Sequence, residues 1–338
     1  MPSLVSLITP TLNAGRYISE TLASVNGQDY PALEQIIVDG GSTDDTLERV
    51  GREGRRVADV LPGPDSGTSE AINKGFARAR GEFVWILNAD DGLAGSTAIS
   101  RLVGHLLRHE EADFVFGHMR LVNGQGRPIG QRTFRAGYGI LDLLSDRRHL
   151  PFAGCLLRRR MLDTLGGFNP AFRFANDLDF LLRLTRVGTM QGIGEATGVF
   201  RLHGEASTSR NIALTGAETV RICRDHLERP DLPREVSARR PYLEAAVNFY
   251  AASVAFHVGT PREVREALRQ AAQADPLVCK RMNYWLYSLS ALLGSRAMAC
   301  VSGWSRRLIH SPWFQELNSR LSWEICPPTF RDRNHHLP

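Results

Sequence analysis

An apolar strand that runs directly into two carboxylates is the feature of this sequence best suited to chemistry. Residues 83–91 read FVWILNADD, so Asp90 and Asp91 follow a run of apolar side chains. The carboxyl end of a buried strand is where open α/β sheets bind ligands. Burying carboxylates there costs desolvation free energy unless a cation offsets it. A divalent metal that carries a phosphorylated substrate would do so. The junction therefore predicts a metal–phosphate site.

Other acidic residues end or begin predicted elements. Asp39 closes the apolar run 35–39, and Asp177 and Asp179 stand at the start of a predicted helix. If the strands before Asp39 and Asp90 are neighbours, Asp39 can accept hydrogen bonds from a base or ribose while Asp90 holds a metal on a diphosphate. Asp39 alone would be interpreted as a turn residue, because Asp-Gly-Gly-Ser is good turn chemistry. The occurrence of Asp39 together with Asp90 favours a functional role for Asp39. Asp179 is interpreted as an acid in the first turn of a helix, where the helix dipole favours negative charge.

Strand and helix signals alternate along the first part of the chain. Strands are predicted at 4–9, 35–39, 57–61, 82–87, 112–120 and 192–202, and helices at 17–25, 46–50, 68–79, 96–109 and 178–187. This spacing is typical of βαβ units and predicts an α/β fold, a mostly parallel sheet flanked by helices.

After about residue 210 the alternation of strand and helix signals ends and only helical patterns follow. Amphipathic helices are predicted at 212–227, 241–257 and 261–274. We therefore expect a catalytic domain at 1–210 and a helical C-terminal region at 211–338. The uncharged run 282–295 has 14 residues, too few to span a bilayer, and suits a packed helix or an interfacial one.

Composition narrows the class of protein. Hydrophobic content of 43% and charged content of 23% are ordinary for a globular chain. The net charge is +5, and only Lys74 and Lys280 of the 41 basic residues are lysine. Arginine suits phosphate and acidic surfaces, but genome composition is the better explanation of this bias. We expect no nucleic-acid partner. The five cysteines form no CxxC pair, which argues against a zinc knuckle or a disulfide framework and fits a reducing cytoplasm.

Two phosphate-binding signatures are missing. No G-x-G-x-x-G follows the first predicted strand, and no P-loop with its lysine occurs. A metal must then neutralise most of the phosphate charge, helped by Lys74 or an arginine.

Several motifs, in order and at matching spacing, resemble family 2 glycosyltransferases. They are VSLITPTLN at 5–13, IIVDGGSTD at 36–44, PDSG at 64–67, AINKG at 71–75, LNADD at 87–91, GGF at 166–168, ANDLDFLLR at 175–183 and RLH at 201–203, followed by Ser207 and Ser209. The resemblance covers roughly the first 210 residues.

This resemblance implies a GT-A fold and inverting transfer of a sugar, hexosyl in type, from a nucleoside-diphosphate sugar such as a UDP-sugar. The acceptor would be a hydroxyl of a glycan or a lipid-linked molecule, in bacterial polysaccharide or cell-surface glycan synthesis. We expect a cytoplasmic protein whose C-terminal helices help to bind the acceptor, a second subunit or the inner membrane face, where the protein would be peripheral.

The family's motifs also imply roles for individual residues. The nucleotide-sugar-binding residues by position are Thr9, Thr11, Asp39, Asp65, Lys74, Asn88 and Asp90. Asp90 falls on the DXD element and would bind Mn²⁺ or Mg²⁺, with His203 as a further metal ligand or a contact to the diphosphate. Asp177 falls on the catalytic-base position. Such roles suit the reaction, because the departing diphosphate needs cationic stabilisation and the acceptor hydroxyl needs a base.

Two departures from the family pattern keep alternatives open. Asn88 stands where the first aspartate of DXD is usual, and Asn176 replaces a glutamate that often precedes the base. A degenerate sugar-nucleotide-binding or scaffold protein without transferase activity is therefore one alternative. A nucleotidyltransferase is another, although residues 13–16 (NAGR) are not its Gly- and Lys-rich loop.

Overall fold

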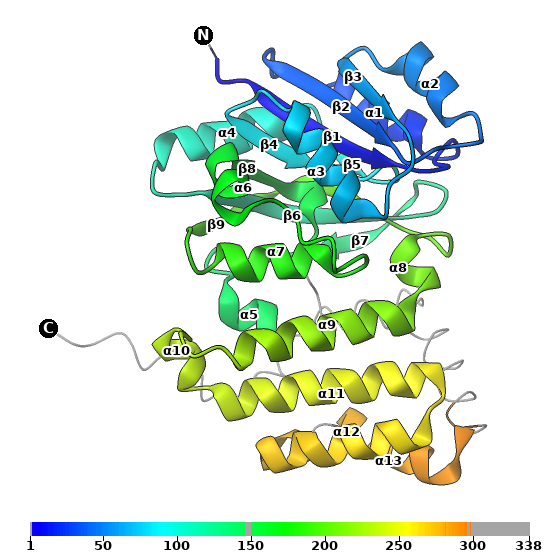
Figure 1. Ribbon diagram of the computed structural model, residues 1–338, viewed down its shortest axis with the longest axis vertical. Helices are drawn as coiled ribbons and strands as arrows, with labels where there is room; N and C mark the ends of the chain where they lie inside the picture. Colours follow the sequence, from blue (N-terminus) through cyan, green and yellow to red (C-terminus); the bar gives the residue numbers. More distant parts are fainter. Residues whose placement is uncertain (1, 146–149, 281, 296–297, 299–338) are drawn as a thin grey trace, which may run out of the picture. The chain divides into compact units, whose positions relative to one another are not determined.

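The computed structural model describes residues 2–145, 150–280, 282–295 and 298 (Figure 1). The chain divides into two compact units, with the first ending at Ala238 and the second beginning at Arg239. The sequence suggested a boundary at residue 210, and the division between the two units lies further along the chain. Helices α8 (Ser207–Arg210), α9 (Ile212–Leu227) and α10 (Arg234–Ser237) therefore belong to the first unit.

Four parallel strands form the first half of the sheet. They are β1 (Val5–Thr11), β2 (Leu33–Asp39), β3 (Val57–Pro62) and β4 (Phe83–Ile86), in the order β3-β2-β1-β4. Thr11 pairs with Asp39, and Asp39 with Pro62, so these carboxyl ends meet at one edge. The strands before Asp39 and Asp90 are not direct neighbours, because β1 lies between them.

The second half of the sheet mixes directions. It contains β5 (Gly92–Leu93), β6 (Phe114–Asn123), β7 (Pro128–Arg132), β8 (Cys155–Arg158) and β9 (Met190–Leu202). β8 runs antiparallel between β4 and β6, while β9 is parallel to β6. β5 pairs with β9, with Gly92 opposite Val199. The end of β9 thereby comes beside the residues that follow β4.

Helices cover both faces of the parallel strands. α1 (Ile18–Asn26), α2 (Thr46–Glu53) and α3 (Thr68–Arg78) follow the first three strands. Ile37 packs with α1 and α2, whereas Val38, on the opposite face, packs against α3. Gly75 lets α3 approach the sheet, since a Cβ there would lie 2.4 Å from Cγ2 of Ile8. The predicted α/β arrangement is confirmed.

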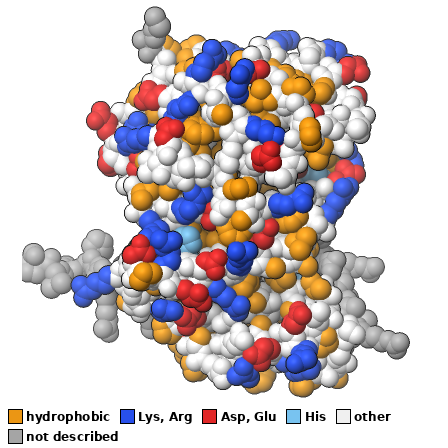
Figure 2. Space-filling model, viewed as in Figure 1, with side chains coloured by type: hydrophobic (Ala, Val, Ile, Leu, Met, Phe, Trp, Pro, Cys, Tyr) orange, Lys and Arg blue, Asp and Glu red, His pale blue; other side chains and the backbone are white. Residues whose placement is uncertain are grey.

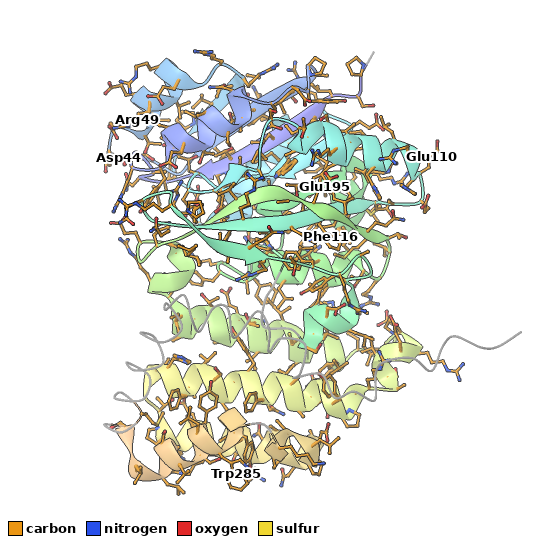
Figure 3. All side chains as sticks on the ribbon, turned by 180° about the vertical axis from the view of Figure 1, so that it is seen from behind. Asp44, Arg49, Glu110, Phe116, Glu195 and Trp285 are labelled. Carbon is orange, nitrogen blue, oxygen red and sulfur yellow. The ribbon has the colours of Figure 1, made fainter. Side chains whose placement is uncertain are left out.

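Five further helical segments of the first unit lie between β5 and β9 in the described part of the chain. They are α4 (Ala98–Arg108), α5 (Ile140–Ser145), the 3₁₀ turn η1 (Phe152–Gly154), α6 (Arg159–Leu165) and α7 (Asn176–Leu184). α7 packs against α5, α6 and α9. Phe180 of α7 stacks on Phe168 with ring centroids 4.5 Å apart, and both meet Phe152 edge-on. Phe116 of β6, labelled in Figure 3, extends this aromatic core toward Phe134. The packing fixes the start of α7.

The second unit is helical. Its described elements are α11 (Arg240–Val258), α12 (Pro261–Ala274), the 3₁₀ turn η2 (Pro276–Lys280) and α13 (Met282–Leu293). Phe249, Phe256 and Tyr287 are buried together in its core. In the part of the chain that the structure describes, no helix is both long and apolar enough to cross a bilayer.

Candidate active site

The loops that follow β1 and β2 are hydrogen-bonded to each other. Asn13 adopts a left-handed backbone conformation, with φ of 48°. Its Oδ1 accepts from the Thr43 amide (2.8 Å), and its own amide donates to Ser42 Oγ (2.8 Å). The Gly15 amide donates to Asp44 Oδ2 (3.0 Å), and Asp44 is labelled in Figure 3. These bonds make one rigid rim at the carboxyl edge of the sheet.

Asp39 is both a turn residue and part of this rim. Its Oδ2 accepts from the amides of Gly41 (3.1 Å) and Ser42 (2.9 Å), and Ser42 Oγ donates to Oδ1. Asp65 comes close to the same turn, since a Cβ at Gly40 would lie 2.8 Å from Asp65 Oδ2. The structure therefore brings Asp39 and Asp65 together, because Asp65 follows β3, whose last residue, Pro62, pairs with Asp39.

Thr9, Thr11 and Lys74 have local partners. Thr9 is fully buried, and its hydroxyl accepts from Gln35 Nε2 (3.0 Å). The Thr11 hydroxyl donates to the Thr9 carbonyl (3.1 Å). Lys74 Nζ donates to the Pro64 carbonyl (2.9 Å) and pairs with Glu70 (2.8 Å). Lys74 thus supports the loop that carries Asp65, and contacts of these three residues with a nucleotide stay predictions.

Asp90 lies against His203, which is 113 positions further along the chain. Nε2 of His203 lies 2.9 Å from Oδ2 of Asp90. The His203 side chain is 7% exposed and its ring meets Tyr17 at 4.5 Å, while the Asp90 side chain keeps 29% of its surface. The pairing of β9 with β5 delivers His203 to this place. The partly exposed carboxylate leaves room for a ligand.

Arg201 supports the Asp90–His203 pair through hydrogen bonds, a role that could not be assigned from the sequence. Its side chain is 4% exposed. Nε donates to the Asp90 carbonyl (2.9 Å) and one terminal nitrogen to the Asn123 carbonyl (3.3 Å). The other terminal nitrogen binds Glu20 (2.6 Å). Arg201 belongs to the Arg-Leu-His motif at 201–203. The motif does not indicate which backbone carbonyls the arginine will bind.

Asp91 is buried beneath Asp90. Burial and the neighbouring Asp90 carboxylate hold the pKa of Asp91 well above its usual range. Its Oδ1 accepts from the Arg201 amide (3.1 Å), and its Oδ2 from Asn88 Nδ2 (3.4 Å). Asn88 itself is exposed at the edge. Asp91 therefore supports the turn, and Asp90 presents the accessible carboxylate.

The Asp90–His203 pair fits a divalent metal that takes its remaining ligands from elsewhere. Among the described residues, no group of three or more His, Cys, Asp or Glu side chains could hold a metal. Ligand atoms at right angles, each about 2.1 Å from a metal, lie about 3.0 Å apart. The 2.9 Å between Nε2 and Oδ2 matches that spacing as well as a hydrogen bond. Ions such as Mg²⁺ commonly bind one or two carboxylates together with substrate phosphates and water.

Asp177 occupies the first turn of α7 and is half-buried. Its charge lies close enough to the Cys155 thiol to add to the effect of burial, which raises the pKa of that thiol well above its usual range. Because β8 runs antiparallel to β4, its first residue, Cys155, lies toward the carboxyl end of β4. Asp177 and Asp90 therefore lie toward the same edge of the sheet.

The neighbours of Asp177 in the motif have structural partners. Asn176 is buried, and its Nδ2 donates to Ser69 Oγ (3.0 Å). Asp179 pairs with Arg183 (2.9 Å) inside α7. Asp177 keeps part of its surface exposed, and its Oδ1 accepts from the Leu178 amide (2.8 Å).

The fold and site together define a GT-A-type α/β enzyme. Solved structures with this fold include Staphylococcus aureus TarS 1-349 in complex with UDP-GlcNAc, with a TM-score of 0.61 and 19% identity over 93% of this chain and 92% of that one. Mannosyltransferase PcManGT from Pyrobaculum calidifontis, in complex with GDP-Man and Mn²⁺, has a TM-score of 0.56 at 19% identity, covering 90% and 88%.

Sequence comparison identifies the family. Residues 6–166 match the sequence model of Glycosyl transferase family 2. A PGL/p-HBAD biosynthesis glycosyltransferase of Mycobacterium bovis is 31% identical over 186 residues, which cover 53% of this chain and 69% of that protein. The O-antigen biosynthesis protein RfbC of Myxococcus xanthus is 30% identical over 248 residues, 70% of this chain but 19% of that protein. The chain belongs to glycosyltransferase family 2 and is a glycosyltransferase, as the motifs predicted.

Proposed function

We propose that this enzyme transfers a sugar, with inversion and with Mn²⁺ or Mg²⁺, from a nucleoside-diphosphate sugar to a hydroxyl of a glycan or lipid-linked acceptor. The observation that carries the proposal is the Asp90–His203 pair at the carboxyl edge of the sheet. The donors in the neighbouring structures, UDP-GlcNAc and GDP-Man, support a nucleotide sugar. We take a UDP-sugar as the first candidate.

Asp90 Oδ2 and His203 Nε2 would hold the metal. When bound, the ion would neutralise charge that builds up on the departing diphosphate. Arg201 keeps Asp90 in place by binding its carbonyl, so the carboxylate is oriented before the donor arrives. This preorganisation lowers the free energy needed to assemble the site.

Asp39, Asp65 and Thr11, at the carboxyl edge of the sheet, would bind the nucleotide. Asp39 uses each carboxylate oxygen in the turn, yet a carboxylate has about four acceptor positions and can still accept from a ribose or base. Asp65 lies beside it, so close to Gly40 that a Cβ on this glycine would collide with Asp65 Oδ2. Lys74 would act through the 64–67 loop, whose Pro64 carbonyl it binds.

Asp177 would act as the general base. The acceptor oxygen forms a bond to the anomeric carbon as the bond from that carbon to the diphosphate oxygen breaks. The acceptor's proton passes to a carboxylate oxygen of Asp177. Inversion requires the acceptor and the diphosphate to lie on opposite faces of the sugar, an arrangement that the separate sequence positions of Asp90 and Asp177 permit.

The names of the relatives support a role in bacterial glycan synthesis. Proteins named for PGL/p-HBAD and O-antigen biosynthesis match this chain. We propose a comparable polysaccharide or cell-surface glycan pathway. A cytoplasmic location with peripheral contact at the inner membrane face is part of the same proposal.

A thermal-shift screen of nucleotide sugars tests the donor class. A ligand that binds the folded state at 100 times its Kd stabilises it by about 2.7 kcal/mol. We expect one or two nucleotide sugars to raise the melting temperature when Mn²⁺ is present and to do so much less with EDTA. No shift with any nucleotide sugar and either metal would contradict the proposal and favour a degenerate scaffold.

A further inference from the structure

A glutamate on α9 binds the backbone directly before the helix that carries Asp177. Glu218 Oε1 accepts from the Arg173 amide (3.0 Å). Its Oε2 accepts from the amides of Phe174 (2.8 Å) and Ala175 (3.0 Å). One carboxylate thus binds three consecutive amides. Hydrogen bonds to an ionised acceptor are about twice as strong as neutral ones.

These amides lie at the N-terminus of α7, which lacks a cap of its own. The N-cap residue is Ala175, whose side chain has no oxygen to accept a bond. Glu218 takes over the function of a capping carboxylate from another helix. A negative charge at this end of α7 is also favoured by the helix dipole. Asp177 lies two residues beyond the last amide that Glu218 holds.

The other side of the same segment is bonded to α3. Asn73 binds the backbone of Phe168 in both directions, through Oδ1 (2.8 Å) and Nδ2 (2.8 Å). Ser69 Oγ donates to the Phe172 carbonyl (2.7 Å). Residues 166–175 are therefore held between α3 and α9, and α9 lies beside α7 in the first unit (Figure 1).

The held segment also contacts the predicted donor loop. The Arg173 side chain lies over Gly67, where a Cβ would come within 3.2 Å of it. Asp65 binds the Gly67 amide (2.9 Å). The backbone that Glu218 fixes thus adjoins the Asp65 loop on one side and begins α7 on the other.

We propose that Glu218 is a positioning residue that holds Asp177 in its place for proton abstraction. This inference rests on the proposed function, because it requires Asp177 to be the base. Glu218 lies beyond residues 6–166, the part of the chain that matches the family's sequence model. It would act through backbone geometry, without contacting donor or acceptor.

The test compares Glu218→Gln with Glu218→Asp in the full chain. The glutamine keeps the shape but puts an amide donor against backbone amides, and the aspartate keeps the charge but is one methylene shorter. A displacement of about 1 Å can reduce a rate by about 100-fold. We expect kcat to fall on the order of 100-fold in Glu218→Gln, and less in Glu218→Asp. The KM and the calorimetric Kd for the donor should stay within about threefold, well short of the tenfold change that 1.4 kcal/mol represents.

Hydrogen exchange provides a readout that does not depend on activity. The amides of Arg173, Phe174 and Ala175 share two carboxylate oxygens in the wild type but a single carboxamide oxygen in Glu218→Gln. At least one of these amides therefore loses its acceptor and should exchange at least about tenfold faster. Asp225→Asn is the matched control, because Asp225 is on the same helix, pairs with Arg221 and is 57% exposed. That variant should keep the wild-type kcat and exchange rates.

The inference and the proposed function fail in different ways. Normal kcat in both Glu218 variants, with Asp177→Asn inactive, would overturn the positioning role alone. Full activity of Asp177→Asn would remove the base and with it the inference, whatever the exchange rates. Equal losses in kcat and donor affinity would show that Glu218 only maintains the fold, and would also overturn the positioning role.

Discussion

His203 Nε2 lies 2.9 Å from Asp90 Oδ2, although the two residues are 113 positions apart. The contact exists because β9 runs back along β5 and ends beside the turn that follows β4. A buried imidazole and a partly exposed carboxylate are thereby aimed at the same point.

The first prediction concerns metal-dependent donor binding. Asp90→Ala and His203→Ala each remove one of the two proposed protein ligands. We expect each substitution to weaken metal-dependent donor binding by at least roughly 10- to 100-fold, the loss that follows mutation of residues that only hold a metal's ligands in place. Calorimetry with the best nucleotide sugar from the screen, with Mn²⁺ or with EDTA, measures it. Unchanged affinity in Asp90→Ala would remove that residue from the site.

The second prediction separates chemistry from binding. Asp177→Asn should leave the donor Kd nearly unchanged and lower kcat by roughly 100- to 10,000-fold, the usual contribution of a general base. A matched control is Asp163→Asn, which changes an acid near the end of α6. Wild-type turnover in Asp177→Asn would assign the base role to another group.

The third prediction concerns the brace under the metal site. Arg201→Lys keeps the positive charge but cannot reach the carbonyls of Asp90 and Asn123 and the Glu20 carboxylate together. Leaving buried acceptors unpaired costs about 1–3 kcal/mol. Denaturant unfolding should show this loss, and donor affinity should fall with it. Arg52→Lys, at an exposed pair with Glu48, should change neither quantity.

The fourth prediction is a pH dependence of stability. Burial alone would raise the pKa of Glu34, but hydrogen bonds from Ser6 and Arg80 outweigh it and hold that pKa below its usual range. The stabilisation is therefore complete above the unfolded pKa, about 4.3, and is lost as the pH falls through the lower folded value. Glu34→Gln should reduce the free energy of unfolding by about 1–3 kcal/mol at pH 7.

The difference between wild type and Glu34→Gln should shrink below about pH 4. Urea unfolding of both proteins from pH 7 to pH 3 measures it. Glu48→Gln, at an exposed glutamate, serves as the control. A difference that stays constant across this range would show that the Glu34 charge contributes nothing to the fold.

The fifth prediction concerns the membrane contact proposed for the second unit. Trp285, Leu289 and Leu292 of α13 are 58%, 58% and 72% exposed and share one stripe at helical spacing. Trp285 is labelled in Figure 3 at the surface of that unit. On the face seen in Figure 2, basic and acidic side chains are interspersed. We expect the apolar stripe to supply most of the affinity for a membrane.

Flotation with phosphatidylglycerol vesicles tests this contact. We expect the wild-type protein to float and the triple serine variant at 285, 289 and 292 to lose more than about tenfold in binding, since each buried leucine contributes about 1.5–3 kcal/mol. Leu107→Ser, at a leucine of α4 that is 52% exposed, is the control. Wild-type protein that stays with the soluble fraction would refute the membrane proposal.

The sequence by itself determined the class of fold and the family. Alternating βαβ signals predicted parallel strands with helices on both faces, and β1 to β4 with α1 to α3 confirm them. Short motifs such as 87–91 sufficed to identify the family, because a reacting side chain and the turn that presents it are close in sequence. The same locality explains why Asp90 and Asp177 could be selected before any contact was known.

Only the tertiary structure decided how those residues are supported. Strand pairing places His203 on Asp90, Arg201 beneath it, and Asp65 beside Asp39. Glu218 could not be anticipated, because its partners are backbone amides 43 to 45 positions away that every sequence possesses. Side-chain types reveal which residues can react, whereas hydrogen bonds to distant backbone depend on how the chain is packed.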